Sequence, residues 1–332
     1  MLENLMALSL TVINFLQTNL AFLTPIMRFF TFLGNEEFYL LIMPLFLWSL
    51  DYDAGIRLGL MLMASGTLNT FMKLSFQQPR PYWVSADIQD LASPMGSFGL
   101  PSGHSQNAAS VIGLLSTFTR HKWLKGTLYF TIVMIALSRL FLGVHSLADI
   151  VLGLTIGLFL LWTFLSVEEK IAKAFNGLTV LLRILIVFAV SLALILLGVL
   201  INALSGDQSL PAVWVQNAHL AHPQTEISPY SLDGLVSSAS VLFGLIAGSV
   251  WIKETGGYNA KAGSLVKHLL RFIIGIVGVI IIWKGLGGLF PRGEDLLCQC
   301  FRYLRYALVG LWIAGLAPKM FVALKLGERG RK

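Results

Sequence analysis

The stretch LADIVLGLTIGLFLLWTFLS, residues 147–166, carries a single charged side chain, that of Asp149. About twenty predominantly apolar residues in helical form suffice to cross the hydrocarbon core of a bilayer. Lipid offers the backbone no hydrogen-bonding partners, so a crossing segment of this kind must be a helix. The stretch therefore predicts a transmembrane helix that holds a carboxylate near its start.

Similar apolar runs recur along the 332 residues, of which 56% are hydrophobic and only 12% charged. A soluble domain would carry about 25% charged residues, so the composition excludes a disordered chain, a nucleic-acid-binding domain and most cytosolic folds. We predict an all-α, polytopic transmembrane bundle. Its spans, about nine in number, are expected at residues 37–50, 54–76, 104–120, 123–143, 147–166, 179–202, 232–252, 267–289 and 302–324.

Residues 8–33 form a further apolar stretch that Asn14, Gln17, Asn19 and Pro25 interrupt. We expect an amphipathic helix in the membrane interface there, with a full span as the alternative. Glycines in the C-terminal part of the chain indicate close packing between helices. They are Gly275, Gly278, Gly285, Gly287 and Gly288.

The net charge of +7 does not indicate a nucleic-acid partner, because no basic run is interleaved with aromatic residues. About two thirds of the 24 Lys and Arg residues lie in alternate connections that include the C-terminal Arg331 and Lys332. The positive-inside rule predicts that this face, with the C-terminus, is cytoplasmic. The opposite connections, to which Arg292 belongs, then face the periplasm, the cell surface or an organelle lumen.

Three polar clusters fall on that exterior face: KLSFQQPRP at 73–81, LPSGHS at 100–105 and SRLFLGVHSLADI at 138–150. Charged groups at the ends of apolar helices are costly and call for a reason. Lys73, Arg80 and Arg139 have no acidic residue within a helical turn in sequence. Such cations suit a dianionic ligand, since Arg matches phosphate oxygens with a planar fork and Lys supplies a point charge.

The other residues of the clusters add donors and a proton-transfer system. Ser102 and Gly103 open a predicted helix, whose free N–H groups favour an anion. His145 and Asp149 share one helix face, so the carboxylate can hold one imidazole nitrogen and leave the other as a nucleophile. His104 is an imidazole with a pKa suited to protonating a leaving oxygen near neutral pH. Together they predict phosphoryl transfer through a histidine, with no metal and no cofactor.

Each residue also has an ordinary structural interpretation when it is taken alone. A lone cation at a membrane interface is commonly an anchor whose charge reaches the headgroups. A lone histidine at a helix start, or a His–Asp pair one turn apart, can be structural. The ordered combination at fixed spacing favours the functional interpretation.

The three clusters resemble the signature of the type 2 phosphatidic acid phosphatase superfamily, over roughly residues 20–170. That signature is Lys, six residues, Arg-Pro; then Pro-Ser-Gly-His; then Ser-Arg, five residues, His, three residues, Asp. The matching positions here are Lys73, Arg80-Pro81, Pro101 to His104, Ser138-Arg139, His145 and Asp149. The resemblance implies a core of about six helices with its active site at the outer membrane face.

The resemblance also implies a role for each residue. His145 would be the nucleophile that forms a phosphohistidine, Asp149 would orient it, and His104 would act as general acid and then as base. The phosphate oxygens would be held by Lys73, Arg80, Ser102, Gly103 and Arg139. We therefore expect residues 1–170 to be the phosphatase core and residues 171–332 an accessory transmembrane region of unknown function.

The signature recognises phosphate and leaves the attached group open. We expect a metal-independent membrane phosphatase acting on a lipid phosphomonoester or diphosphate, of the phosphatidic acid or prenyl diphosphate type. A lipid phosphotransferase remains an alternative, as does a sugar-phosphate phosphatase, because the Arg-Pro-Tyr-Trp run at 80–83 and the nine spans resemble glucose-6-phosphatase. A lipid or phosphate transporter is the non-enzyme alternative. Loop 202–231, with Asn217, His219, His222 and Glu226, either caps the site or selects the substrate, or it is an ordinary solvated loop. The oligomeric state stays open.

Overall fold

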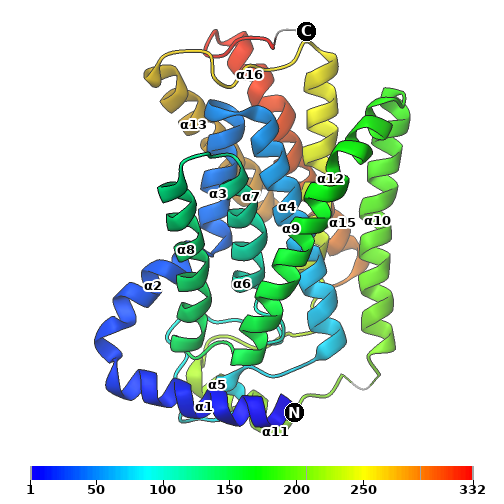
Figure 1. Ribbon diagram of the computed structural model, residues 1–332. Helices are drawn as coiled ribbons and strands as arrows, with labels where there is room; N and C mark the ends of the chain where they lie inside the picture. The colour runs from blue at the N-terminus through cyan, green and yellow to red at the C-terminus, as the bar shows by residue number, and fades with distance from the viewer. Residues whose placement is uncertain (1, 207, 292, 331–332) are drawn as a thin grey trace. The chain divides into compact units, whose positions relative to one another are not determined.

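The computed structural model describes residues 2–206, 208–291 and 293–330, and the regular elements in these ranges are all helices (Figure 1). Asp207, Arg292, Arg331 and Lys332 lie outside the described residues. Six helical segments within those ranges are long and apolar enough to cross a membrane. They are α8 (Lys122–Phe141), α9 (Leu147–Asn176), α10 (Val180–Leu204), α12 (Asp233–Glu254), α13 to α14 (Leu265–Leu289) and α15 to α16 (Leu296–Ala323). The predicted all-α, multi-pass membrane fold is confirmed.

Two of these segments contain a turn of π-helix. In the first, η4 (Ile281–Gly285) joins α13 (Leu265–Ile280) to α14 (Leu286–Leu289). In the second, η5 (Trp312–Leu316) joins α15 (Leu296–Leu311) to α16 (Ala317–Ala323). Each segment therefore continues as one helix through a local widening.

The remaining predicted spans are helical as well, although they fall short in length or in hydropathy of what the six segments reach. Residues 37–50 correspond to α3 (Glu36–Leu45) with η2 (Phe46–Leu50), and residues 54–76 to α4 (Tyr52–Phe76). Residues 104–120 correspond to three consecutive segments: α6 (Gly103–Asn107), η3 (Ala108–Ile112) and α7 (Gly113–Thr117). The prediction of about nine spans is thus roughly consistent with the helices observed.

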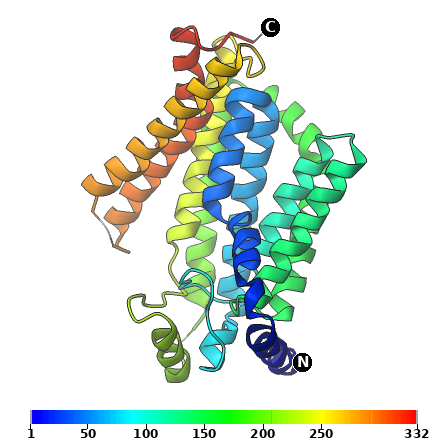
Figure 2. The same ribbon diagram turned by 90° about the vertical axis from the view of Figure 1, so that its left-hand side faces the viewer.

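The N-terminal stretch is bent by 84° between α1 (Leu2–Asn19) and the pair η1 (Ala21–Leu23) and α2 (Thr24–Phe32). α1 lies across the ends of α8 and α9, where Leu147 N donates to Ser9 Oγ at 3.0 Å (Figure 2). Its Gln17 side chain donates to Gln89 O at 2.9 Å and to Phe141 O at 3.2 Å. The polar residues of this stretch therefore satisfy neighbouring backbone groups. The interfacial position of residues 8–33 stays a prediction.

The chain divides into two compact units that are each assembled from separate stretches of sequence. The first comprises residues 1–38, 68–164 and 198–231, and the second comprises residues 39–67, 165–197 and 232–332. The first unit has its core around Trp83, Phe98 and Phe141 and holds all the predicted site residues. The functional division at residue 170 stays a prediction.

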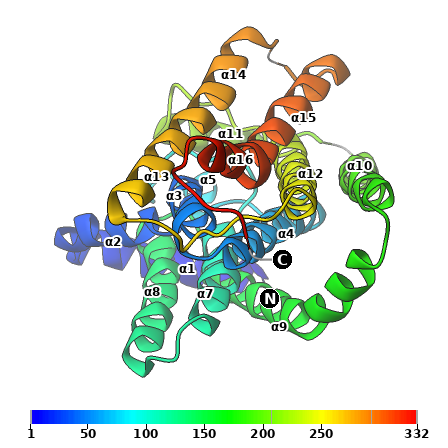
Figure 3. The same cartoon turned by 90° about the horizontal axis from the view of Figure 1, so that it is seen from above.

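The core of the second unit lies around Trp48, whose indole Nε1 donates to Ile313 O at 2.9 Å. Gly244 of α12 contacts the backbone of Ala307 in α15, and these helices pack side by side (Figure 3).

The predicted close packing at the C-terminal glycines holds for some of them. Added methyl groups would overlap Trp48 at Gly275, Trp312 at Gly278 and Arg305 at Gly287. The prediction is wrong for Gly285 and Gly288, where an added Cβ would have no atom of the described residues within 4 Å.

Candidate active site

His145 and Asp149 meet at the start of α9. His145 lies in the turn after α8, which Gly143 enables with a φ of +76°. Its Nδ1 lies 3.2 Å from Asp149 Oδ2, and Ser146 N donates to the same oxygen at 2.8 Å. Both side chains are about 1% exposed. The carboxylate therefore fixes the proton on Nδ1 and leaves the lone pair on Nε2.

Arg80 is the residue that faces that lone pair. Its Nη1 lies 3.3 Å from His145 Nε2 and donates to Val144 O at 3.0 Å. Its Nε donates to Ser97 O at 2.7 Å, and its Nη2 donates to Phe98 O at 3.3 Å and to Ser97 Oγ at 3.2 Å. A guanidinium has five N–H groups, and these five contacts give each of them a partner. Three carbonyls and the Ser97 hydroxyl satisfy the buried charge and hold it beside Nε2 of His145.

Ser97 brings Lys73 into the same cluster. The hydroxyl of Ser97 accepts from Lys73 Nζ at 2.8 Å as well as from Arg80 Nη2. Two cations thus converge on one oxygen atom, and a phosphate oxygen is a stronger acceptor for the same donors. Sequence reasoning missed Ser97, because a serine in a Pro-, Ser- and Gly-rich connection carries no distinguishing pattern.

Ser102 and Gly103 bring the start of α6 to the beginning of α9. Ser102 N donates to Asp149 O at 2.9 Å, and Ser102 Oγ caps α6 by accepting from Ser105 N at 3.4 Å. Gly103 packs against Asn69, whose Oδ1 would lie 3.1 Å from an added Cβ. The Ser102 side chain therefore caps α6, and the Ser102 backbone N–H ties the second cluster to the third.

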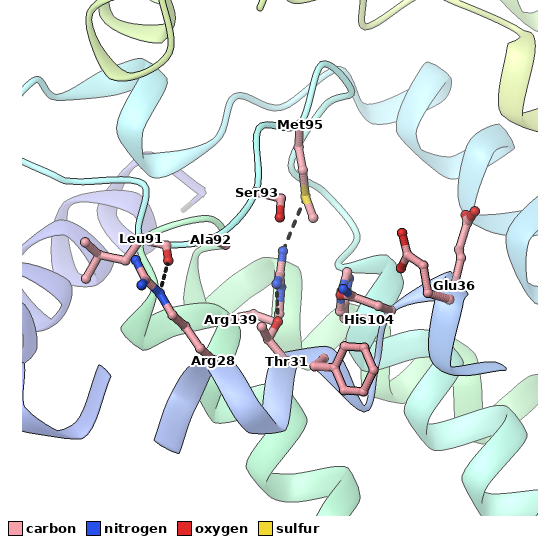
Figure 4. A pocket seen from close by; sticks show the side chains of 12 residues that line it. Arg28, Thr31, Glu36, Leu91, Ala92, Ser93, Met95, His104 and Arg139 are labelled. Carbon is pink, nitrogen blue, oxygen red and sulfur yellow. Dashed lines mark hydrogen bonds between the residues drawn. The ribbon is translucent and has the colours of Figure 1, made fainter. Parts of the chain in front are cut away.

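His104 and Arg139 face a cavity of about 520 Å³ (Figure 4). His104 Nε2 lies 2.8 Å from Asn35 Oδ1, which orients the ring. Arg139 donates through Nη1 to Thr31 Oγ1 and through Nη2 to Met95 Sδ at 3.3 Å. Its buried Nε has no partner among the described residues. The cavity is lined by Arg28, Thr31, Phe32, Asn35, Glu36, Glu37, Leu91, Ala92, Ser93, Met95, His104 and Arg139.

The predicted residues therefore form two groups within the first unit. Six of them do not line the cavity: Lys73, Arg80, Ser102, Gly103, His145 and Asp149. Lys73 and Gly103 are half-buried, and the other four are buried. His104 and Arg139 form the cavity wall. The backbone links the groups, because His145 N donates to Arg139 O at 3.3 Å.

The electrostatic environment keeps His145 neutral. Its imidazole lies in the turn between α8 and α9, outside both helices. Burial, followed by the positive charges of Arg80 and Arg139, lowers the pKa of His145 well below its ordinary value of 6.5. An unprotonated Nε2 at neutral pH is what a histidine nucleophile requires.

Loop 202–231 contains α11 (Ala212–Ala221), which packs on α5 (Pro81–Val84) directly after Arg80. Asn217 Nδ2 donates to Trp83 O at 3.0 Å, and His222 Nε2 lies 2.8 Å from Asp90 Oδ2. Of the loop residues singled out in the sequence, Asn217 and His222 therefore hold the segment that carries Arg80. The other two, His219 and Glu226, are exposed.

Comparison with protein families finds two separate matches. A model of the PAP2 superfamily matches residues 54–173, which contain all three polar clusters. A second model, described as the PAP2 superfamily phosphatase, transmembrane extension, matches residues 236–329. The C-terminal helices thus match a known transmembrane extension of PAP2 superfamily phosphatases.

Three of the similar proteins are phosphatases by name. Sphingosine-1-phosphate phosphatase 1 of Mus musculus is 28% identical over 148 residues, or 42% of this chain and 34% of that protein. Phosphatidylglycerophosphatase B of Bacillus subtilis is 33% identical over 126 residues, covering 34% of this chain and 59% of that protein. Glucose-6-phosphatase 3 of Homo sapiens is 23% identical over 345 residues, covering 96% of this chain and 95% of that protein.

The chain spans about a third of the length of the sphingosine-1-phosphate phosphatase that it matches. No solved structure matches the chain. The two family matches, the signature clusters and the apolar helices together show that this chain is a multi-pass membrane protein of the PAP2 superfamily.

Proposed function

We propose that the chain is a membrane phosphatase that transfers a phosphoryl group from a phosphomonoester to His145 and then to water. One observation carries the proposal: Asp149 holds Nδ1 of His145 while Arg80 faces Nε2 from 3.3 Å. This arrangement orients the imidazole, fixes its tautomer and places a positive charge where a phosphate would approach. The similar proteins, all phosphatases by name, support the same reaction class.

In the first step, the Nε2 lone pair of His145 attacks phosphorus. A P–N bond forms, the P–O bond to the leaving group breaks, and His104 gives its proton to the leaving oxygen. The Arg80 N–H that faces Nε2 in the free site moves to a phosphate oxygen. Lys73 and Arg139 neutralise the remaining negative charge on the phosphate oxygens. Electrostatic stabilisation of this kind is the main source of catalysis in such sites.

In the second step, water attacks the phosphorus of the phosphohistidine. His104, now neutral, accepts a proton from that water, and the P–N bond breaks to release inorganic phosphate. His145 returns to its neutral form with its proton on Nδ1, because Asp149 holds that tautomer throughout. No metal ion takes part in either step, so a chelator is expected to leave the activity intact.

The substrate is proposed to be a lipid phosphate. The matches to sphingosine-1-phosphate phosphatase and to phosphatidylglycerophosphatase B support this class. A sugar phosphate is the second candidate, favoured by the match to glucose-6-phosphatase 3 over 96% of this chain. A phosphotransferase would use the same first step and pass the phosphoryl group to an acceptor alcohol. A transporter that only binds phosphate would not need the His104 and His145 pair.

The site is proposed to open to the exterior face, with the C-terminus in the cytoplasm. The excess of Lys and Arg in the alternate connections supports this orientation. Reporters fused after the C-terminal residue test the orientation: a reporter active only in the cytoplasm should work there. Activity of an exterior-only reporter at the same position would reverse it.

The direct test is phosphate release by the purified full chain in detergent with a chelator present. Phosphatidic acid, sphingosine 1-phosphate, glucose 6-phosphate, a prenyl diphosphate and phenyl phosphate form the substrate panel. Release from at least one substrate by the wild type, and its loss in His145→Ala, is the expected result. Undiminished release in His145→Ala would exclude the proposed nucleophile.

A further inference from the structure

Two carboxylates line the cavity beside the proposed general acid. Glu36 and Glu37 form the first turn of α3, directly after Asn35, whose side chain orients His104. Both glutamates are exposed, and both line the same cavity as His104 and Arg139. Figure 4 shows His104 between Arg139 on one side and Glu36 on the other.

The reaction determines which part of the substrate lies beside the two glutamates, and this step rests on the proposed function. His104 protonates the leaving oxygen, so the carbon skeleton attached to that oxygen must begin next to His104. The phosphate itself lies toward Arg139, Arg80 and Lys73. The site is thus divided by charge, with cations at the phosphate end and carboxylates at the leaving-group end.

The carboxylates are available to a ligand. Salt bridges within the described ranges involve neither Glu36 nor Glu37. Arg28, which also lines the cavity, donates through Nε to Leu91 O at 2.9 Å, on another wall. An ionised carboxylate only accepts hydrogen bonds. A hydroxyl or ammonium group on the leaving group would be bound, whereas a second phosphate would be repelled.

We propose that Glu36 and Glu37 are specificity-determining residues that select phosphomonoesters of alcohols bearing hydroxyl or ammonium groups and disfavour diphosphates. Two sources share that chemistry. A sphingoid-base phosphate has an ammonium and a hydroxyl group near its ester, and a hexose phosphate has several hydroxyls. Phosphatidic acid lacks such donors, and a prenyl diphosphate would place a phosphate against the carboxylates.

A purely structural role would have a different consequence. Carboxylates in the first turn of a helix stabilise it through the helix dipole, and their loss would lower stability and affect all substrates alike. A role in substrate selection would instead change the ratio of kcat/KM between substrates. Glu3 supplies a matched control, because it is an exposed glutamate in the first turn of α1 in the same unit and does not line the cavity.

The experiment compares kcat/KM for wild type, Glu36→Gln, Glu37→Gln, the double variant and Glu3→Gln. Sphingosine 1-phosphate, glucose 6-phosphate and a prenyl diphosphate are each measured relative to phenyl phosphate, whose leaving group has no further donor. The ratio for the preferred donor-bearing substrate should fall about tenfold in each single glutamine variant, as loss of a charged hydrogen-bond acceptor predicts. The ratio for the diphosphate should rise, and Glu3→Gln should leave both ratios at wild-type values.

Comparison of the substrates identifies the class of leaving group that the glutamates select. A fall confined to sphingosine 1-phosphate assigns a sphingoid base, and a fall confined to glucose 6-phosphate assigns a sugar. An equal change for all substrates, or no change in either ratio, would overturn the assignment while leaving the phosphatase intact. Phenyl phosphate hydrolysis that survives in His145→Ala would instead overturn the proposed function, so the two failures are distinguishable.

Discussion

Arg80 Nη1 lies 3.3 Å from His145 Nε2 and points its N–H at the lone pair of the proposed nucleophile. In the free site this contact holds the imidazole against Arg80. An entering phosphate offers Arg80 an anionic oxygen in place of a neutral nitrogen, and the planar guanidinium matches phosphate oxygens in both charge and geometry. In the proposed mechanism, substrate binding therefore releases the lone pair as phosphorus comes within reach.

The first prediction concerns pH. Burial and the charges of Arg80 and Arg139 lower the pKa of His145, and only the neutral imidazole can attack. A lowered pKa keeps the nucleophile neutral to lower pH, so kcat/KM should fall on the acid side only below about pH 6.5, the ordinary histidine value. A pH series of kcat/KM in detergent measures this. An acid limb centred above that value would contradict the environment described for His145.

Ser97 should matter for phosphate binding although it carries no charge. Its hydroxyl is the shared acceptor of Lys73 and Arg80, so Ser97→Ala leaves both cations without a common anchor. We expect kcat/KM to fall about tenfold, the effect of one lost charged hydrogen bond, with a matching loss of inhibition by inorganic phosphate. Ser97→Thr, which restores the hydroxyl, should recover both quantities. An alanine variant with wild-type phosphate inhibition would remove Ser97 from the site.

Asp149 should act through orientation of His145. Asp149→Asn keeps the size of the side chain but can present an N–H to Nδ1, which favours the wrong tautomer. By analogy with the Asp-to-Asn change in a serine protease triad, we expect kcat to fall at least about a hundredfold. Thermal unfolding of the variant provides the control for folding. A variant that retains more than a tenth of the wild-type kcat would show that the tautomer is fixed by another group.

α11 should hold the segment that carries Arg80. Asn217 Nδ2 donates to Trp83 O, so Asn217→Ala should release α11 from α5 and expose loop 202–231 to protease. The loss of one hydrogen bond is worth about 1 kcal/mol, or roughly a fivefold faster cleavage. The exposed His219 on the same helix gives the matched control, His219→Ala. Equal cleavage rates in both variants would indicate that the loop is held elsewhere.

Much of the candidate site could be predicted from the sequence, because the spacing of residues within each cluster determines which side chains can lie close together. Ser102 caps the helix that it was expected to open. His145 and Asp149 meet as expected, but they do not share a helix face, because His145 lies in the turn before α9. The residues that hold these side chains in place could not be predicted from the sequence. Ser97 reaches Lys73 across 24 positions and Asn35 reaches His104 across 69, and no local pattern encodes contacts of that range. Gly285 and Gly288 show the same limit, because a glycine does not reveal whether a neighbour lies against it.

The most direct measurement is to capture the phosphorylated enzyme. The purified protein is mixed with a substrate carrying a radioactive phosphoryl group, denatured within one turnover and assayed for label that is stable to base and released by acid. We expect such label on the wild-type chain at His145 and none on His145→Ala. Turnover by the wild type without label on His145, or equal labelling of both proteins, would contradict the phosphohistidine mechanism.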